Sequence, residues 1–193
     1  CKTVGAKLAL VFGCTCDVIS SIDLEASEYE DQTFQCPSIT SDSLCYVIFT
    51  SGSTGEPKAT AVTHKNVLNY CACNSVNVCG KVIEEGDKSI LSVTNIVFDI
   101  FVTESLLALI NGIKIVLADD ASVMSEKLLA PLIRSGVDVI QTTPTKMRSY
   151  LLDKDFRSAV SSLNKIMLGG EELTSSLLTD LRSLTDAAVY NVI

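Results

Sequence analysis

The chain has 193 residues, of which 47% are hydrophobic, and 15 basic against 23 acidic side chains give it a formal net charge of −8 at pH 7. A chain of this length and apolar content can bury a sizeable core, so a globular body is expected. The acidic balance and the lack of a basic run exclude nucleic acid and anionic membrane surfaces as partners.

Short apolar runs rich in β-formers predict buried strands along the chain. The strands are expected at residues 7–12, 46–49, 89–93, 113–118, 137–141, 165–168 and 188–193. Helical patterns lie between most of them, and the clearest runs from Phe98 to Ile110 with Gly112 as a stop signal. The other helices are expected at residues 64–79, 126–134, 145–152 and 174–184.

Strand and helix therefore alternate from residue 46 onward, which predicts an α/β fold with a mostly parallel sheet flanked by helices on both faces. Residues 13–43 are rich in Ser, Asp, Glu and Thr and are interpreted as an exposed connection within one domain.

The sequence shows no membrane span or secretion signal. Its most apolar stretch, residues 106–118, is far shorter than the roughly 20 uninterrupted apolar residues that a membrane helix needs. The chain lacks an initiator methionine, so we expect it to start inside a longer polypeptide. Its eight cysteines, without a secretion signal, predict reduced thiols and a cytoplasmic location.

Two Cys-x-Cys pairs, Cys14/Cys16 and Cys71/Cys73, raise the question of zinc. Neither has Cys-x-x-Cys spacing, and His64 is the only histidine. Buried free thiols are the favoured interpretation, and no metal site is predicted.

The sharpest local signal is YVIFTSGSTGEPK at residues 46–58, where an apolar strand runs into Ser, Gly and Thr followed by a lysine. Glycines allow close approach, so backbone N–H groups and hydroxyls can surround phosphate oxygens while the lysine adds positive charge. The spacing differs from that of P-loop NTPases. A flexible Gly/Ser hairpin is the alternative. The predicted phosphate site comprises Thr50, Ser51, Gly52, Ser53, Thr54, Gly55 and Lys58.

The segment TSGSTGEPK resembles the signature loop of the adenylate-forming superfamily, which includes acyl-CoA synthetases, luciferases and peptide-synthetase adenylation domains. The family usually has glycine after the lysine, where this chain has Ala59. If the backbone there needs positive φ, alanine costs about 1 kcal/mol. His64 resembles the family's histidine just beyond the loop, although a polar residue near a helix start is an equally good interpretation.

The segment NIVFDIFVTE at residues 95–104 resembles the adenylation-domain motif FDxS, with Asp99 as the aspartate that pairs with the α-amino group of an amino acid. Asp99 and Thr103 are four residues apart and would share a helix face. A buried carboxylate needs a partner, which an ammonium group supplies. Alternatively, Asp99 only favours the positive end of the helix dipole.

By the same resemblance, further positions line the substrate and adenine sites. Their mixed character suggests a small to medium neutral substrate side chain, although Ile100 and Met167 are equally expected as core residues. The substrate positions are Asp99, Ile100, Thr103, Gln141, Met167, Gly169 and Val192. The adenine positions, in KIMLGGEELT and VYNVI, are Gly169, Gly170, Glu171 and Asn191. A Gly-Gly turn that simply ends a strand explains the first of these segments equally well.

The resemblance implies a single partial domain, the core of the N-terminal subdomain of an adenylation enzyme of nonribosomal peptide synthesis. Such an enzyme activates an amino acid with ATP as an aminoacyl adenylate and transfers it to the phosphopantetheine thiol of a peptidyl carrier protein domain. The family's Mg²⁺ ligand and catalytic lysine lie outside this chain, so the 193 residues alone are expected to be inactive. An acyl-CoA or aryl-acid ligase, an aminoadipate-reductase type of enzyme and a non-catalytic relic that binds nucleotide or a partner are the alternatives.

Overall fold

The structure, a computed structural model, describes residues 8–11, 20–23, 38–50, 57–72, 86–118 and 126–192. The chain divides into two units, Cys1–Lys65 and Asn66–Ile193. Within the described residues, no helix is both long and apolar enough to cross a membrane.

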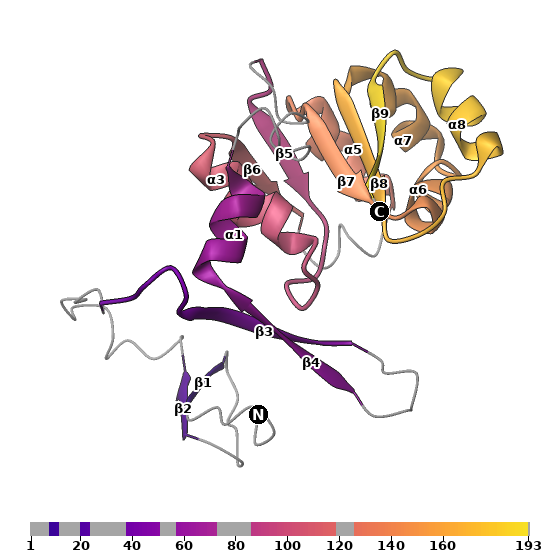
Figure 1. Ribbon diagram of the computed structural model, residues 1–193. Coiled ribbons are helices and arrows are strands. Elements are labelled where there is room, and N and C mark those ends of the chain that lie inside the picture. The colour runs from indigo at the N-terminus through magenta and orange to yellow at the C-terminus, as the bar shows by residue number, and fades with distance from the viewer. Residues whose placement is uncertain are drawn as a thin grey trace. The chain divides into compact units, whose positions relative to one another are not determined.

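The first unit contains two separate pairs of strands (Figure 1). β1 (Leu8–Val11) and β2 (Ser20–Asp23) are parallel, and β3 (Leu44–Thr50) and β4 (Lys58–Thr63) form an antiparallel hairpin. The predicted strand at residues 46–49 is therefore confirmed, but its predicted place in the βαβ alternation is wrong.

Two of these strands were not predicted. β2 lies inside the stretch interpreted as a connection, and β4 has the sequence KATAVT, in which alanine and threonine carry too little apolar character to stand out. Because β4 follows β3 directly, the signature loop closes a hairpin and does not lead from a strand into a helix.

The second unit is built on a five-stranded parallel sheet, which confirms the predicted fold class. Its strands in spatial order are β6 (Lys114–Leu117), β5 (Ser89–Ser92), β7 (Val139–Thr142), β8 (Lys165–Gly169) and β9 (Ala188–Val192).

The helices agree with the expected positions, with one addition. α1 (His64–Cys71) begins in the first unit and continues into the second, and Cys73–Cys79 of its predicted length lie outside the described residues. The helix predicted from Phe98 begins at Phe101 and passes through a π-helical segment, η3 (Thr103–Leu107), into α3 (Ala108–Ile110). The other predicted helices are α5 (Glu126–Arg134), α6 (Pro144–Tyr150) and α8 (Ser175–Arg182).

The addition is α7 (Lys154–Ala159), which continues into a 3₁₀ turn, η4 (Val160–Ser162). It begins at Asp153, whose carboxylate accepts a hydrogen bond from the backbone N–H of Phe156 at 2.9 Å. Phe156 and Ala159 then point into the core. The short helix was missed because it offers only two turns of apolar spacing.

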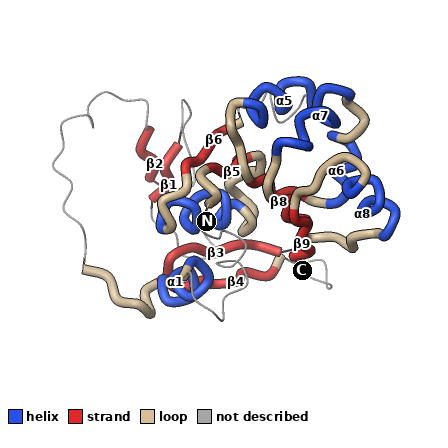
Figure 2. The backbone as a smooth tube through the Cα atoms, turned by 90° about the horizontal axis from the view of Figure 1, so that it is seen from above, coloured by secondary structure: helices blue, strands red, loops and turns tan. Residues whose placement is uncertain are grey.

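Helices cover both faces of the sheet. On one face, Leu91, Ile140, Ile166 and Leu168 pack with buried residues of α5, α6, α7 and α8 into the main core. Figure 2 shows α5 and α7 side by side above this face. On the other face, Glu104 of η3 hydrogen-bonds Ser92 of β5, so the Phe101–Ile110 helix lies there.

α1 is tied to that second helix. Asn111 donates a hydrogen bond from its side chain to the backbone oxygen of Cys71 at 3.1 Å, and the Tyr70 and Thr103 hydroxyl oxygens are 2.6 Å apart. The side chain of Cys71 is fully buried, as predicted, whereas Cys14, Cys16 and Cys73 lie outside the described residues.

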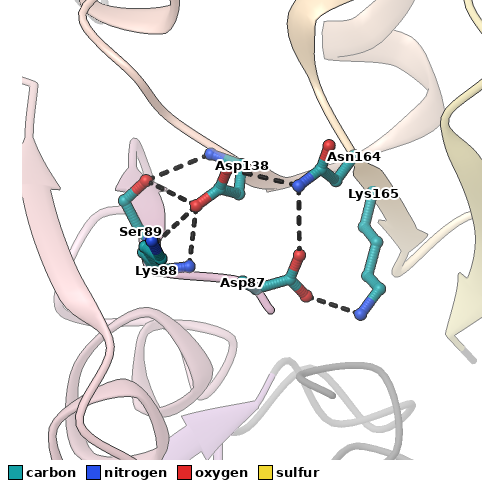
Figure 3. Close-up of polar contacts among 6 residues, drawn as sticks. All are labelled: Asp87, Lys88, Ser89, Asp138, Asn164 and Lys165. Carbon is teal, nitrogen blue, oxygen red and sulfur yellow. Dashed lines mark hydrogen bonds and ion pairs between the residues drawn. The ribbon is translucent and has the colours of Figure 1, made fainter. Parts of the chain in front are cut away.

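A polar network joins the amino ends of β5, β7 and β8 (Figure 3). One carboxylate oxygen of Asp138 accepts hydrogen bonds from the backbone N–H groups of Lys88, at 2.7 Å, and Ser89, at 3.0 Å, and from the Ser89 hydroxyl. The other accepts from the Asn164 amide at 3.2 Å. Asp138 thus aligns the starts of three strands.

Beside it, Asp87 and Lys165 form an ion pair of 2.5 Å, with side chains only 4% and 12% exposed. Removal of either partner of such a buried pair would destabilise the fold, because it would leave an uncompensated charge.

We expect Asp138→Ala to lower the free energy of unfolding by about 2–3 kcal/mol, because backbone donors at the buried start of β5 lose their acceptor. Asp138→Asn, which keeps one acceptor oxygen, should lower it by about half as much. Urea unfolding measures both values, and an equal effect of the two substitutions would contradict the proposed acceptor role.

Gly169 is held against the neighbouring strand, because a Cβ atom there would lie 2.5 Å from the backbone oxygen of Val192. Gly169→Ala should therefore displace β9 and destabilise the chain by about 1–3 kcal/mol. Urea unfolding checks this, with Ser161→Ala, at an exposed position of η4, as the control, expected to change stability by less than about 0.5 kcal/mol. A fully stable Gly169→Ala variant would show that β9 shifts without strain.

Candidate functional site

The carboxyl ends of the parallel strands meet at one edge of the sheet, where ligands of open α/β folds usually bind. Gln141 is near the end of β7, Gly169 ends β8 and Val192 ends β9. Residues 93–103, which follow β5, reach the same edge. The sequence-predicted substrate positions thus gather at one edge.

Strand register brings four of these positions to one face. Gln141 pairs with Met167 across β7 and β8, and Gly169 pairs with Val192 across β8 and β9. Because side chains alternate along a strand, Met167 and Gly169 share a face, and with them Gln141 and Val192. This is the face that carries the Phe101–Ile110 helix at β5.

Gln141 is the polar group of this set. Its side chain is only 2% exposed, and its Oε1 atom has no hydrogen-bond partner among the described residues. An unpaired buried carbonyl is unfavourable, so a hydrogen-bond donor brought by a ligand would be stabilised there.

Asp99 lies in a turn before the helix, where its backbone oxygen accepts from Val102 N–H at 2.9 Å. Its side chain is exposed, and Ile100 is half-buried. Thr103 is fully buried, and its hydroxyl contacts that of Tyr70. The expectation that Asp99 and Thr103 share a helix face is therefore wrong, because the helix begins at Phe101 and the two side chains have different environments.

Glu104 is a residue to which sequence reasoning assigned no role, although it lies within the quoted FDxS-like segment. Its buried carboxylate accepts from the Ser92 and Thr94 hydroxyls and from the backbone N–H groups of Val93 and Thr94. Burial raises the pKa of Glu104, while the hydrogen bonds from Thr94, Ser92 and Val93 partly oppose that rise. The sequence feature that could have identified Glu104 is an acidic residue among the apolar positions of a predicted helix.

The predicted adenine residues form the turn after β8 and part of β9. Gly170 has φ of +77°, a conformation that favours glycine. Glu171 accepts hydrogen bonds from the backbone N–H and the hydroxyl of Thr145 near the start of α6. The Thr145 hydroxyl is the main cause that lowers the pKa of the exposed Glu171. Asn191 is exposed and pairs with Leu168, so it alternates to the face opposite Val192.

The predicted phosphate site belongs to the first unit. Thr50 and Lys58 pair directly across the β3–β4 hairpin, and both are exposed. Ser51, Gly52, Ser53, Thr54 and Gly55 lie outside the described residues.

Ala59 of β4 pairs with Phe49 of β3. Among the described residues, no residue other than glycine has a positive φ. The strain considered for alanine at this position is therefore absent. His64 is the first residue of α1, and its backbone N–H donates to Ser43.

Comparisons with known proteins agree with this geometry. A family model described as "AMP-binding enzyme" matches residues 8–192. A dimodular nonribosomal peptide synthase of Bacillus subtilis is 34% identical over 76% of the chain, and tyrocidine synthase 3 of Brevibacillus parabrevis is 28% identical over 98%. The chain spans only 6% and 3% of these two relatives.

Solved structures share the fold. The holo-PA1221 structure, an NRPS protein containing adenylation and PCP domains, matches this chain with a TM-score of 0.82 at 21% identity. The match covers 100% of this chain and 33% of the PA1221 chain. The N-terminal subdomain of NpsA from Klebsiella oxytoca, in complex with 3-hydroxyanthranilyl-AMSN, matches with a TM-score of 0.77 at 17% identity. That match covers 98% of this chain and 48% of the NpsA chain.

The family match over almost the whole chain, the parallel sheet and the peptide-synthetase relatives lead to one assignment. The chain belongs to the AMP-binding enzymes of the adenylate-forming superfamily.

Proposed function

We propose that the chain is part of an enzyme that activates an amino acid carboxylate with ATP as an aminoacyl adenylate, and passes it to the phosphopantetheine thiol of a peptidyl carrier protein domain. The observation that carries this proposal is an exposed carboxylate, Asp99, in the FDxS-like segment at the carboxyl edge of the sheet. The peptide-synthetase relatives support it.

Asp99 is proposed to bind the substrate ammonium group. Its exposure leaves the carboxylate accessible, and an ammonium group would form a charge-assisted hydrogen bond with it. Gln141 and Met167 lie on the face that we propose borders the substrate side chain, and Gly169 adds no side chain to that face. The unpaired Oε1 of Gln141 is suited to a substrate that offers a donor.

The β3–β4 hairpin is proposed to hold the ATP phosphates. The opposed Thr50 and Lys58 place a hydroxyl and an ammonium group at the base of the loop, which suits phosphate oxygens. Mg²⁺ would neutralise charge on the polyphosphate, and its protein ligand is proposed to lie outside this chain. Within the described residues, no cluster of three or more His, Cys, Asp or Glu side chains is present that could hold a metal ion.

The rest of the longer protein is proposed to complete the site, because the chain spans a small part of its relatives. The 193 residues alone are then inactive, and activity belongs to the complete polypeptide that carries them.

Asp99→Ala and Asp99→Asn in the complete polypeptide should both lower kcat/KM for amino-acid-dependent ATP–pyrophosphate exchange, by about 100-fold. The neutral asparagine lacks the charge that pairs with ammonium, so it should not restore activity. Exchange driven equally well by acids that lack the amino group would indicate the alternative acyl-CoA or aryl-acid ligase. Binding of a stable adenylate analogue without any exchange activity would favour the non-catalytic alternative.

Glu171→Gln tests whether this carboxylate acts on fold stability. Its folded pKa is lowered, so its stabilising effect is present above the unfolded pKa and is lost as the pH falls through the folded pKa. Wild type should melt at a higher temperature than Glu171→Gln at pH 7, and the difference should shrink on acidification. A pH-independent difference would contradict this, and a raised KM for ATP at pH 7 would support the proposed adenine contact.

A further inference from the structure

The segment that carries Asp99 is closed by one buried side chain. Residues 95–103 leave the sheet after β5 and return to it at η3, and Glu104 comes directly after them. Its Oε2 atom accepts from Ser92 Oγ at 2.9 Å and from the backbone N–H groups of Val93 and Thr94, each at 3.0 Å. Its Oε1 atom accepts from Thr94 Oγ1 at 2.6 Å. The two ends of the segment are thus joined through one carboxylate.

Between these ends, few interactions hold the segment to the rest of the described chain. The hydrogen bonds before Asp99 are local: Asn95 accepts from Val97 N–H at 3.1 Å through its side chain and from Phe98 N–H at 3.0 Å through its backbone. Ile96, Val97 and Phe98 are each more than half exposed. Side-chain packing therefore does little to set where Asp99 lies, and the anchored ends determine it.

The local helix geometry agrees with this role. Glu104 is the second residue of the π-helical segment, a rare conformation that often marks functional sites. Its carboxylate is fully buried, which is unfavourable for a charge unless hydrogen bonds compensate. The four hydrogen bonds supply that compensation, all of them from the end of β5 and the two residues after it.

We propose that Glu104 is a positioning residue for Asp99, which holds residues 95–103 against the end of β5 so that the Asp99 carboxylate meets the substrate ammonium group. This inference rests on the proposed function. Glu104 does not touch the substrate, and its effect on the reaction passes through the position of Asp99.

The test removes the hydroxyl donors and keeps Glu104. In the complete polypeptide, the double variant Ser92→Ala, Thr94→Val loses both side-chain hydrogen bonds and keeps the backbone ones. Its KM for the amino acid should rise about three- to tenfold in ATP–pyrophosphate exchange, with the KM for ATP unchanged within about twofold.

Thr185→Ala is the control. Thr185 is also a buried hydroxyl residue of the second unit, but it lies before β9, where its hydroxyl accepts from Ala187 N–H at 3.0 Å. This variant should lower the melting temperature and leave both KM values unchanged. Equal KM changes in the control and the double variant, or a parallel rise of both KM values, would overturn the positioning role.

Substitution of Glu104 itself gives a second readout. In Glu104→Gln the amide oxygen can face the three donors at Oε2 while its NH₂ group faces the Thr94 hydroxyl, so this variant should retain most activity. Glu104→Ala leaves Val93 and Thr94 N–H without acceptors and should raise hydrogen exchange in residues 95–103. Unchanged exchange in that segment would contradict the inference.

The outcomes separate the two proposals. If wild type shows no amino-acid-dependent exchange, the proposed function fails and this inference fails with it. If wild type is active and Asp99→Ala is not, but the double variant has an unchanged KM for the amino acid, only the positioning role is refuted.

Discussion

Alignment of the parallel strands β5, β7 and β8 is the constraint on which the site depends. Asp138 joins the starts of β5 and β7 and reaches Asn164 beside β8, while the ion pair of Asp87 with Lys165 lies next to it. Since each strand rises by about 3.3 Å per residue, a slip of one residue at this end would misplace every side chain at the other. The residues at the carboxyl ends of these strands therefore inherit their positions from contacts at the opposite end of the sheet.

Two glutamates organise the ligand edge. Glu104 closes the segment that carries Asp99, and Glu171 joins the turn after β8 to Thr145 near the start of α6. Their environments differ, because burial dominates at Glu104 and hydrogen bonding dominates at the exposed Glu171. In both cases a carboxylate holds a backbone turn where a parallel strand ends.

Periodicity was sufficient to predict the five parallel strands and most helices, because each strand is a short apolar run and the central strands β5, β7 and β8 are buried on both faces. It missed β4, whose KATAVT sequence is weakly apolar, and the two-turn helix α7. Strand register places Gln141, Met167, Gly169 and Val192, which the family resemblance grouped, on a common face of the sheet, whereas their role in binding substrate stays a prediction. The resemblance could not reveal that Asp99 precedes the helix or that Glu104 bonds to β5, because these depend on tertiary contacts.

The close approach of Gly169 to Val192 also limits which residues can end β8. Any side chain added at Gly169 would collide with backbone oxygen, not with a movable side chain. Variation in the shape of this face of the sheet must therefore come from other positions, for instance Gln141 or Met167, where the residue already carries a side chain. Mutational libraries that aim to reshape this face would gain most by leaving this glycine untouched.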